Sequence, residues 1–371
     1  MFLIESMVVG GAEKVLCTLV NHLDPQKYDV TVIAVYKHSV YDGYNHQFEN
    51  LFAPHVKFKY LCDNSSEFKY QNFNRALHWI PGKVMHAALI GRSYDIEVAF
   101  YEGLPTHIIA ASSNSKSKKI AWLHIDTNHL AKHLSDKEKR RNVKNYTKYE
   151  IIVAVSQAVA DSFTNLFGLE KHPLVRYNPI DRNEIISKAN ESITDVLPSE
   201  KFKLVSVGRL VDQKNYDRLL RVYHRLLCEG HDCELWIIGD GEMRDILEEY
   251  VTKNGLQQNV RLLGFKNNPY KYMNMCDLFV CSSRAEGFST VATEATILGL
   301  PIVTTDCAGM KELLGDNTYG IITPNNEEAL YHGIKRILTD KALYAHYRQK
   351  ALERSASFSL EKTIDQFTLI F

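Results

Sequence analysis

Residues 278–295 read LFVCSSRAEGFSTVATEA and contain a strand, a loop and the start of a helix. The apolar run 278–281 is typical of a buried strand, and the polar residues after it, with Gly287, indicate a loop. A helix is predicted to begin near Ser289 or Thr290, since both residue types cap helix starts. This order is typical of a parallel sheet covered by helices, so we predict an α/β fold.

Two glutamates flank this loop: Glu286 precedes it, and Glu294 lies two turns into the predicted helix. In α/β sheets, ligands bind outside the carboxyl ends of the strands. The helix start offers N–H groups and a positive dipole end to a phosphate, and Gly287 lets the backbone approach it. The pair therefore predicts a nucleotide-sugar site. A solvated helix face with two glutamates is the plainer alternative.

Short β-rich runs alternate with helical patterns on both sides of this unit, which predicts parallel sheets with helices on both faces. In the first half, the predicted strands are Phe2–Glu5, Val30–Tyr36, Ile96–Tyr101, Ile120–Leu123, Ile151–Val155 and Leu174–Tyr177. In the second half, they are Leu204–Val207, Glu234–Ile238, Val260–Leu263, Leu278–Cys281 and Pro301–Thr304. Each set is sufficient for one doubly wound sheet.

The chain of 371 residues exceeds what one hydrophobic core usually supports, so two domains are expected. The polar segment 182–201, which contains Pro198, separates the two sets of strands. We predict a first domain over residues 1–180 and a second over 181–355. A helix in residues 356–371 is predicted to pack back on the first domain.

The composition is that of a globular protein, with 45% hydrophobic and 24% charged residues. The seven cysteines include no C-x-x-C pair, which indicates reduced thiols. No apolar run approaches the roughly 20 residues that a membrane helix needs, and the N-terminus lacks the features of a secretion signal. We therefore expect a cytoplasmic protein.

Basic and acidic residues balance at 44 each, yet residues 1–180 hold 21 basic and 17 acidic ones. Seven basic side chains gather in one segment: Lys132, Lys137, Lys139, Arg140, Arg141, Lys144 and Lys148. A helix with such a basic face suits contact with anionic lipid, and a solvated helix is the plainer alternative. The balanced total gives no indication of a nucleic-acid partner.

Residues 204–215, LVSVGRLVDQKN, contain a strand, a glycine and two cations, Arg209 and Lys214. A departing nucleoside diphosphate develops negative charge, so fixed cations stabilise it where no metal does. No Asp-x-Asp metal motif occurs, so we expect neither a metal nor another cofactor. We predict that the two cations clamp the phosphates, although each alone is also typical of a solvated base beside a helix start.

Further candidates lie at other predicted strand ends. They are Gly239, Gly241 and Phe265 in the second domain, and Gly10, Gly11, Lys14, His124 and Asp126 in the first. Each has a structural alternative: a tight turn for the glycines, core packing for the phenylalanine, and a histidine without a catalytic role at a strand end.

These residues resemble the retaining glycosyltransferases of family 4, whose GT-B fold has two Rossmann-like doubly wound domains facing a cleft. EGFSTVATE, residues 286–294, is similar to the family's E-x7-E motif, and the Gly-Arg and Lys-Asn of residues 208–215 are similar to its phosphate clamp. The resemblance covers residues 2–340, and it is strong in 204–306 and thin in 38–115.

The resemblance implies a role for each candidate. The implied catalytic residues are His124, Glu286, Arg209 and Lys214. The implied donor-binding residues are Gly10, Gly11, Gly239, Gly241, Phe265, Gly287, Phe288, Ser289, Thr290 and Glu294, with Glu294 on the ribose. The implied acceptor residues are Lys14 and Asp126.

The implied reaction transfers a hexose-type sugar from a nucleoside-diphosphate sugar, with a UDP-sugar favoured, to an acceptor hydroxyl with retained configuration. The string W-x-H-x-D at 122–126 resembles that of bacterial surface-polysaccharide transferases. It implies a lipid-linked glycan acceptor in capsular polysaccharide synthesis and peripheral contact with the membrane. Two alternatives stay open: a sugar-nucleotide epimerase on this scaffold, and a catalytically silent partner subunit.

Overall fold

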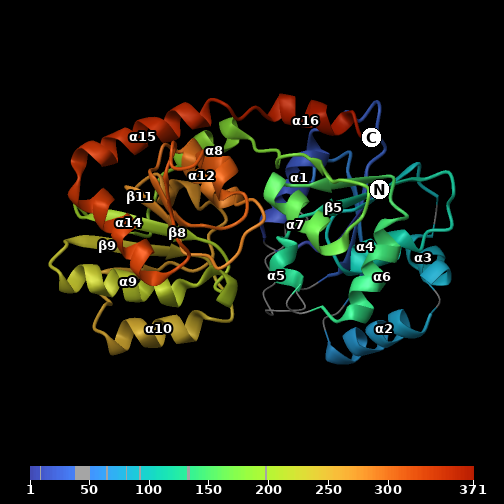
Figure 1. The fold of residues 1–371 in the computed structure, drawn as a ribbon, viewed down its shortest axis with the longest axis horizontal. Coiled ribbons are helices and arrows are strands. Elements are labelled where there is room, and N and C mark those ends of the chain that lie inside the picture. The colour runs from blue at the N-terminus through green and yellow to red at the C-terminus, as the bar shows by residue number, and fades with distance from the viewer. Residues whose placement is uncertain are drawn as a thin grey trace. The chain divides into compact units, whose positions relative to one another are not determined.

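The computed structural model describes residues 1–8, 10–37, 51–63, 66–80, 82–91, 93–131, 134–196 and 199–371. Two residues named above, Lys132 and Pro198, lie outside these described residues. The chain folds into two compact units, shown in Figure 1. The first unit contains Met1–Pro179 and Glu361–Phe371, and the second contains Ile180–Leu360.

Among the described residues of the first unit, seven strands form a parallel sheet in the order β3-β2-β1-β4-β5-β6-β7. The strands are β1 (Phe2–Ser6), β2 (Thr31–Tyr36), β3 (Lys57–Cys62), β4 (Ile96–Ala99), β5 (Lys118–Leu123), β6 (Ile151–Ala154) and β7 (Leu174–Val175). The helices are α1 (Gly11–Asn21), α2 (Glu67–Trp79), α3 (Gly82–Ile90), α4 (Leu104–Ala110), α5 (Thr127–Ala131), α6 (Asp136–Tyr146), α7 (Gln157–Phe167) and α16 (Leu360–Thr368). The strand order reverses direction between β1 and β4, which makes this the topological switch point of the sheet.

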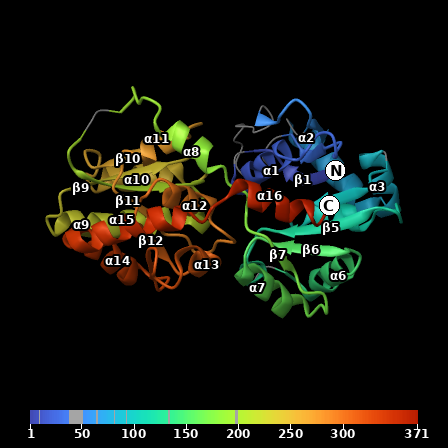
Figure 2. The ribbon, with the colours of Figure 1, turned by 90° about the horizontal axis from the view of Figure 1, so that it is seen from above.

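The last helix completes the core of the first unit. In Figure 2, α16 lies beside β1 and β5. The ring centroids of Phe367 and Trp122 are 4.8 Å apart, and those of Phe371 and Phe2 are 5.6 Å apart. Trp122 and Phe367 are fully buried, so these C-terminal residues belong to the hydrophobic interior of the first sheet.

The second unit contains a six-stranded parallel sheet in the order β10-β9-β8-β11-β12-β13 within the described residues. The strands are β8 (Phe202–Val207), β9 (Cys233–Ile238), β10 (Val260–Leu262), β11 (Leu278–Cys281), β12 (Ile302–Thr305) and β13 (Ile321–Thr323). The helices are α8 (Arg182–Ala189), η2 (Asp212–Lys214, a 3-10 turn), α9 (Tyr216–Cys228), α10 (Arg244–Lys253), α11 (Tyr270–Met273), α12 (Thr290–Ile297), α13 (Met310–Leu314), α14 (Glu327–Thr339) and α15 (Lys341–Ser355). Its switch point lies between β8 and β11.

Helices cover both faces of the second sheet, so its strands are apolar on both sides. Leu235 and Ile237 of β9 pack into one core with α9, α10 and α14. Trp236 and Ile238, which point the other way, pack into a second core with α8, α11 and α12. Figure 1 shows α9 and α10 on one face and α8 and α12 on the other.

The two doubly wound parallel sheets confirm the predicted α/β fold class. Every predicted strand is present, with ends within two residues of those expected. The edge strands β3 and β13 were not predicted. β3 is mostly exposed and contains Lys57 and Lys59, and β13 has only three residues, so neither forms an apolar run. Among the described residues, no helix is long and apolar enough to cross a bilayer.

Candidate active site

The candidate site lies at the switch point of the second sheet, where β8 and β11 are neighbours. The turn after β8 carries Arg209 and Lys214, and the turn after β11 carries Glu286. Because the carboxyl ends of parallel strands meet at one edge of a sheet, Lys214 and Glu286 are in contact although they are 72 residues apart.

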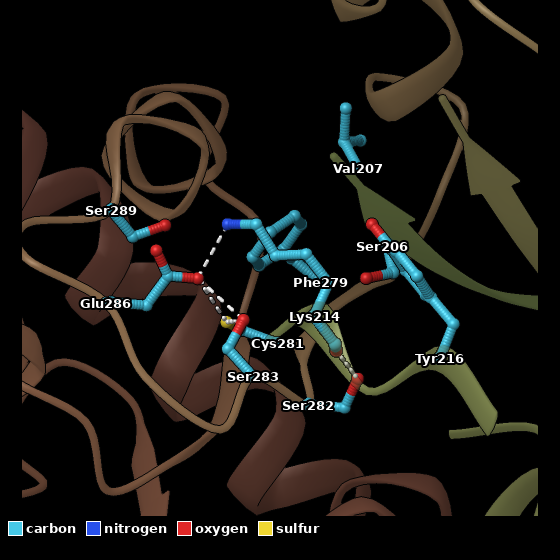
Figure 3. Close-up of a pocket in the computed structure, with 10 residues that line it drawn as sticks. All are labelled: Ser206, Val207, Lys214, Tyr216, Phe279, Cys281, Ser282, Ser283, Glu286 and Ser289. Atoms are coloured by element: carbon cyan, nitrogen blue, oxygen red, sulfur yellow. Dashed lines mark hydrogen bonds and ion pairs between the residues drawn. The ribbon is translucent and has the colours of Figure 1, made fainter. Parts of the chain in front are cut away.

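A small pocket lies between these two turns, as Figure 3 shows. It is lined by Ser206, Val207, Lys214, Tyr216, Phe279, Cys281, Ser282, Ser283, Glu286 and Ser289. Its volume is about 10 Å³, which leaves room for a single water. The pocket itself is therefore too small for a nucleotide sugar.

Glu286 is buried, and the protein holds one of its two carboxylate oxygens. Oε1 accepts hydrogen bonds from Lys214 Nζ at 2.7 Å and from Ser283 Oγ at 2.6 Å. The Cys281 thiol is 3.9 Å from the same oxygen. The other carboxylate oxygen lies on the side of Ser289 in Figure 3. The hydrogen bonds from Lys214 and Ser283 therefore fix Oε1.

Lys214 stays charged in this setting. Burial is the largest single effect and lowers the pKa of its ammonium group, but the charge and hydrogen bond of Glu286 together with Cys281 outweigh burial and raise the pKa above its usual range. The exposed Arg209 guanidinium acts in the lowering direction, which places the two cations near each other. Two adjacent cations suit an anion with two charged groups, such as a diphosphate.

Hydrogen bonds join the two turns directly. Ser282 Oγ donates to the Lys214 carbonyl oxygen at 2.8 Å, and Gln213 Nε2 donates to the Ala285 carbonyl oxygen at 2.8 Å. In return, the Arg284 N–H donates to the Gln213 carbonyl oxygen at 2.8 Å. These hydrogen bonds hold the two turns together, and they thereby hold Lys214 close to Glu286.

The predicted phosphate loop, from Gly287 to Thr290, leads into α12. Ser289 is the N-cap of this helix, and its hydroxyl accepts an N–H of the first turn at 3.3 Å. Gly309 packs against this loop, and its φ is 75°. A Cβ at Gly309 would lie 2.6 Å from the Gly287 carbonyl oxygen and 3.1 Å from Phe288 Cα. Only glycine permits this close approach.

Glu294 is buried on α12, with 4% of its surface exposed. Its Oε1 accepts a hydrogen bond from the Tyr270 hydroxyl at 3.1 Å. This contact gives the carboxylate a structural partner from α11. Its contact with a ribose stays a prediction.

Gly239 and Gly241 pack against the turn that follows β8. A Cβ at Gly239 would lie 1.9 Å from the Gly208 carbonyl oxygen, and one at Gly241 would lie 2.5 Å from the Leu210 carbonyl oxygen. Backbone packing thus explains both glycines, and their contact with a nucleotide stays a prediction. Phe265 is half-buried after β10, and its role toward the base stays a prediction as well.

In the first unit, Gly10 is the N-cap of α1, which begins at Gly11. A Cβ at Gly10 would lie 2.2 Å from Glu13 Oε2, so the Glu13 carboxylate lies directly over this glycine. Glutamate at the third helical position commonly reaches back to the helix start in this way. An anion that approaches Gly10 therefore meets a carboxylate unless the Glu13 side chain turns away. Donor binding by the two glycines stays a prediction.

The two acceptor candidates have local structural settings. Lys14 is half-buried in the first turns of α1. Asp126 Oδ1 accepts the Asn128 N–H at 2.9 Å, which closes a turn before α5. Their contact with an acceptor stays a prediction.

His124 follows β5 and is held by a residue that sequence reasoning missed. Its N–H and the N–H of Ile125 both donate to Glu102 Oε1, at 2.7 and 2.9 Å. The imidazole stacks on Tyr101 with an interplanar angle of 17°. Burial lowers the pKa of His124 to about 3, so the imidazole is neutral near neutral pH.

The sequence prediction missed Glu102, Tyr270, Ser283 and Gly309. Each acts on another residue of the site through one hydrogen bond or one close approach, which leaves no spacing pattern in a sequence. Among the described residues, no group of three or more His, Cys, Asp or Glu side chains is placed to hold a metal ion.

The fold is shared with known GT-B glycosyltransferases. The crystal structure of Anabaena Alr3699/HepE in complex with UDP and glucose matches with a TM-score of 0.75 at 21% identity, over 99% of this chain and 97% of that chain. At this identity the likeness shows the fold, and the two doubly wound units are those of the GT-B class.

The sequence comparison then finds a family match. Residues 188–354, which lie in the second unit, match Glycosyl transferases group 1. An uncharacterized glycosyltransferase of Haemophilus influenzae is 25% identical over 99% of this chain and 97% of its own length.

A relative with a known substrate covers less of the chain. N-acetylgalactosamine-N,N'-diacetylbacillosaminyl-diphospho-undecaprenol 4-alpha-N-acetylgalactosaminyltransferase of Campylobacter jejuni is 36% identical over 220 residues. The match spans 58% of this chain and 58% of that enzyme's length.

Proposed function

We propose that the protein is a retaining, metal-independent glycosyltransferase that moves a hexose-type sugar from a UDP-sugar to a lipid-linked glycan. The Lys214–Glu286 pair at the carboxyl ends of β8 and β11 carries this proposal. It puts a cation for a phosphate 2.7 Å from a carboxylate for a sugar hydroxyl. The two groups suit adjacent parts of a nucleotide sugar, because its phosphate is bonded directly to the sugar.

In the proposed reaction, the leaving diphosphate is stabilised by the protein itself. Lys214 has three donors, so it can bond a phosphate oxygen while it keeps its bond to Glu286. Arg209 supplies a second fixed cation, and the start of α12 supplies N–H groups and a positive dipole end. These three elements take the place that a metal ion has in other transferases.

Retention is proposed to proceed by attack on the same face from which the diphosphate leaves. In this step Glu286 serves as a hydrogen-bond acceptor for a sugar hydroxyl, and hydrogen bonds from Lys214 and Ser283 to its Oε1 hold the carboxylate in place. His124 is neutral, which suits a hydrogen bond to a sugar hydroxyl. A covalent glycosyl-enzyme or an inverted product would contradict this step.

The donor and acceptor classes are inferred from relatives. The Anabaena structure holds UDP, and the Campylobacter enzyme is named for an undecaprenol-diphosphate-linked acceptor. The basic side chains Lys137, Arg140, Arg141 and Lys144 are solvent-accessible on α6, which supports peripheral contact with an anionic membrane from the cytoplasm. This surface would bring the enzyme to a lipid-linked substrate.

A binding screen tests the donor assignment. We expect isothermal calorimetry to detect a UDP-sugar in preference to GDP- and ADP-sugars, and Arg209→Ala to weaken binding at least tenfold. Arg348→Ala, which removes an exposed arginine from α15, is the matched control and should leave binding unchanged. If none of the three nucleotide classes binds, the donor-site assignment is refuted. Epimerised donor in the absence of acceptor would select the epimerase alternative.

A further inference from the structure

Glu102 is a buried carboxyl at the switch point of the first sheet. It follows β4, the strand next to β1, and only 6% of its surface is exposed. His124 follows the neighbouring strand β5 at the same edge. The pairing of β4 with β5 thus brings together two residues that are 22 positions apart in sequence.

One oxygen of this carboxyl fixes the turn after β5. Oε1 accepts the two consecutive N–H groups of His124 and Ile125, at 2.7 and 2.9 Å. Bonds to two consecutive amides determine the direction in which the backbone leaves the strand. They therefore also determine where the imidazole of His124 lies against Phe100, whose ring centroid is 4.8 Å away.

The other oxygen, Oε2, is buried and has no hydrogen-bond partner among the described residues. A buried, unpartnered carboxylate oxygen is costly, and a proton on it removes much of that cost. Burial accordingly raises the pKa of Glu102 to about 7, against the lowering effect of hydrogen bonds from the backbone amides of Ile125, Glu102 and His124. The charge of the group that holds the His124 turn thus changes near neutral pH.

The titratable neighbours do not obscure this change. Tyr146, from α6, has a pKa well above its usual value, mainly because of burial and partly because of Glu102. His124, from the turn after β5, has a pKa of about 3. Both groups are neutral throughout the range in which Glu102 titrates.

We propose that Glu102 is the positioning residue of the His124 turn, and that its ionised form holds this turn in the conformation that serves the glycosyl transfer proposed above. The carboxylate bonds both amides more strongly than the neutral acid does, since charge-assisted hydrogen bonds are roughly twice as strong as neutral ones. Glu102 itself does not contact the reacting atoms. Its effect on the reaction runs through His124.

Nuclear magnetic resonance of the full chain tests the holding contact without any substrate. The amide protons of His124 and Ile125 are expected to shift together with one apparent pKa of about 7 between pH 5.5 and 8.5. Glu102→Gln should abolish this titration, because the amide keeps an acceptor oxygen and loses the charge. Glu97→Gln is the matched control, since Glu97 is a fully buried carboxyl of β4 that bonds neither amide. It should leave the titration in place.

Kinetics then test the consequence for catalysis. The wild-type kcat is expected to rise with the same pKa, and kcat of Glu102→Gln at pH 8 is expected to fall about tenfold with no change in the donor KM. At pH 6 the two proteins should differ little. Amides that do not titrate, or a Glu102→Gln kcat that still rises through pH 7, would overturn the proposal. If no donor supports transfer, the proposed function fails, and the amide titration still decides the role of Glu102.

Discussion

The two units place different chemistry at the same position of the same fold. At the β8–β11 edge, Glu286 is paired with a cation at 2.7 Å and the polar groups around it are bonded to one another. At the corresponding strand end in the first unit, after β4, Glu102 has no ion pair among the described residues and accepts two backbone N–H groups from the turn after β5. The strand order therefore determines where a site lies, and the partners of each carboxyl determine what that site does.

The largest expected effect comes from removing the cation Lys214 at the β8–β11 edge. Lys214→Met should lower kcat/KM about 1000-fold, because the leaving diphosphate loses a fixed positive charge. It should also reduce the free energy of unfolding by about 3 kcal/mol, since Glu286 is left buried and unpaired. Enzyme assays and urea unfolding measure the two effects.

A double variant separates these two effects. Lys214→Met combined with Glu286→Gln should recover most of the lost stability and none of the activity, because the unpaired charge is gone and the catalytic groups are still missing. Lys335→Met, which removes a lysine that is 39% exposed from another ion pair, should change neither quantity appreciably. An activity loss below tenfold in Lys214→Met would contradict the assignment of this lysine to the phosphate.

One glycine from each unit tests how closely the backbone is packed at that position. Gly239→Ala would place a Cβ 1.9 Å from a backbone oxygen of the neighbouring turn, whereas Gly103, with φ at 82°, has nothing within 4 Å of its Cβ position. We expect losses of about 4 kcal/mol for Gly239→Ala and about 1 kcal/mol for Gly103→Ala. Hydrogen-exchange mass spectrometry reports each unit separately. Equal losses would mean that close packing at Gly239 is not decisive.

Between pH 5 and 8, Glu102 should give the first unit a pH-dependent stability. Glu102 has a raised pKa, so between about pH 4.5 and 7 the folded chain retains a proton that the unfolded chain has released. Its contribution to stability is therefore full below pH 4.5 and is lost as the pH rises through about 7. The shift corresponds to about 3 kcal/mol.

Unfolding of the first unit at several pH values measures this contribution. Relative to Glu102→Gln, the wild type should lose stability from pH 5 to pH 8. Glu97→Gln should follow the wild type, because it leaves Glu102 in place. A stability difference that does not vary with pH would argue against the raised pKa of Glu102.

The sequence predicted the fold well because the interior strands carry their own signal. A strand that is buried on both faces, such as β9, reads as an apolar run of the right length wherever it lies in the chain. The edge strand β3 lacks this signal: it contains lysines that face solvent, and its place beside β2 depends on pairing across the sheet. The missed strands are thus those whose structure depends on contacts distant in sequence.

The candidate site divides in the same way. Glu286, Arg209 and Lys214 were predicted because they follow recognisable strands, and the structure brings Lys214 and Glu286 together. Glu102 could not be predicted, because its partners are two backbone amides, and every residue type except proline supplies an amide. The sequence thus indicates charged side chains that follow strand ends, and it gives no sign of the groups that hold them in place.

The smallest expected effect tests that distinction at adjacent residues. Ser282 and Ser283 follow β11, and each is 1% exposed. Ser283 donates to the Glu286 carboxylate at 2.6 Å, whereas Ser282 donates to a backbone carbonyl at 2.8 Å. Ser283→Ala should lower kcat about tenfold with little change in the donor KM, since Glu286 then turns more freely while the phosphate contacts remain. Ser282→Ala should lower kcat about threefold.

A donor analogue distinguishes a positioning role of Ser283 from a merely structural one. If Ser283 holds Glu286 against a sugar hydroxyl, the wild type should discriminate against a donor that lacks this hydroxyl, and Ser283→Ala should discriminate less. Ser282→Ala should retain the wild-type ratio of kcat/KM between the two donors, because its hydroxyl does not touch the carboxylate. If Ser283→Ala slows both donors equally, the serine supports only the loop, and Glu286 reaches the sugar without its help.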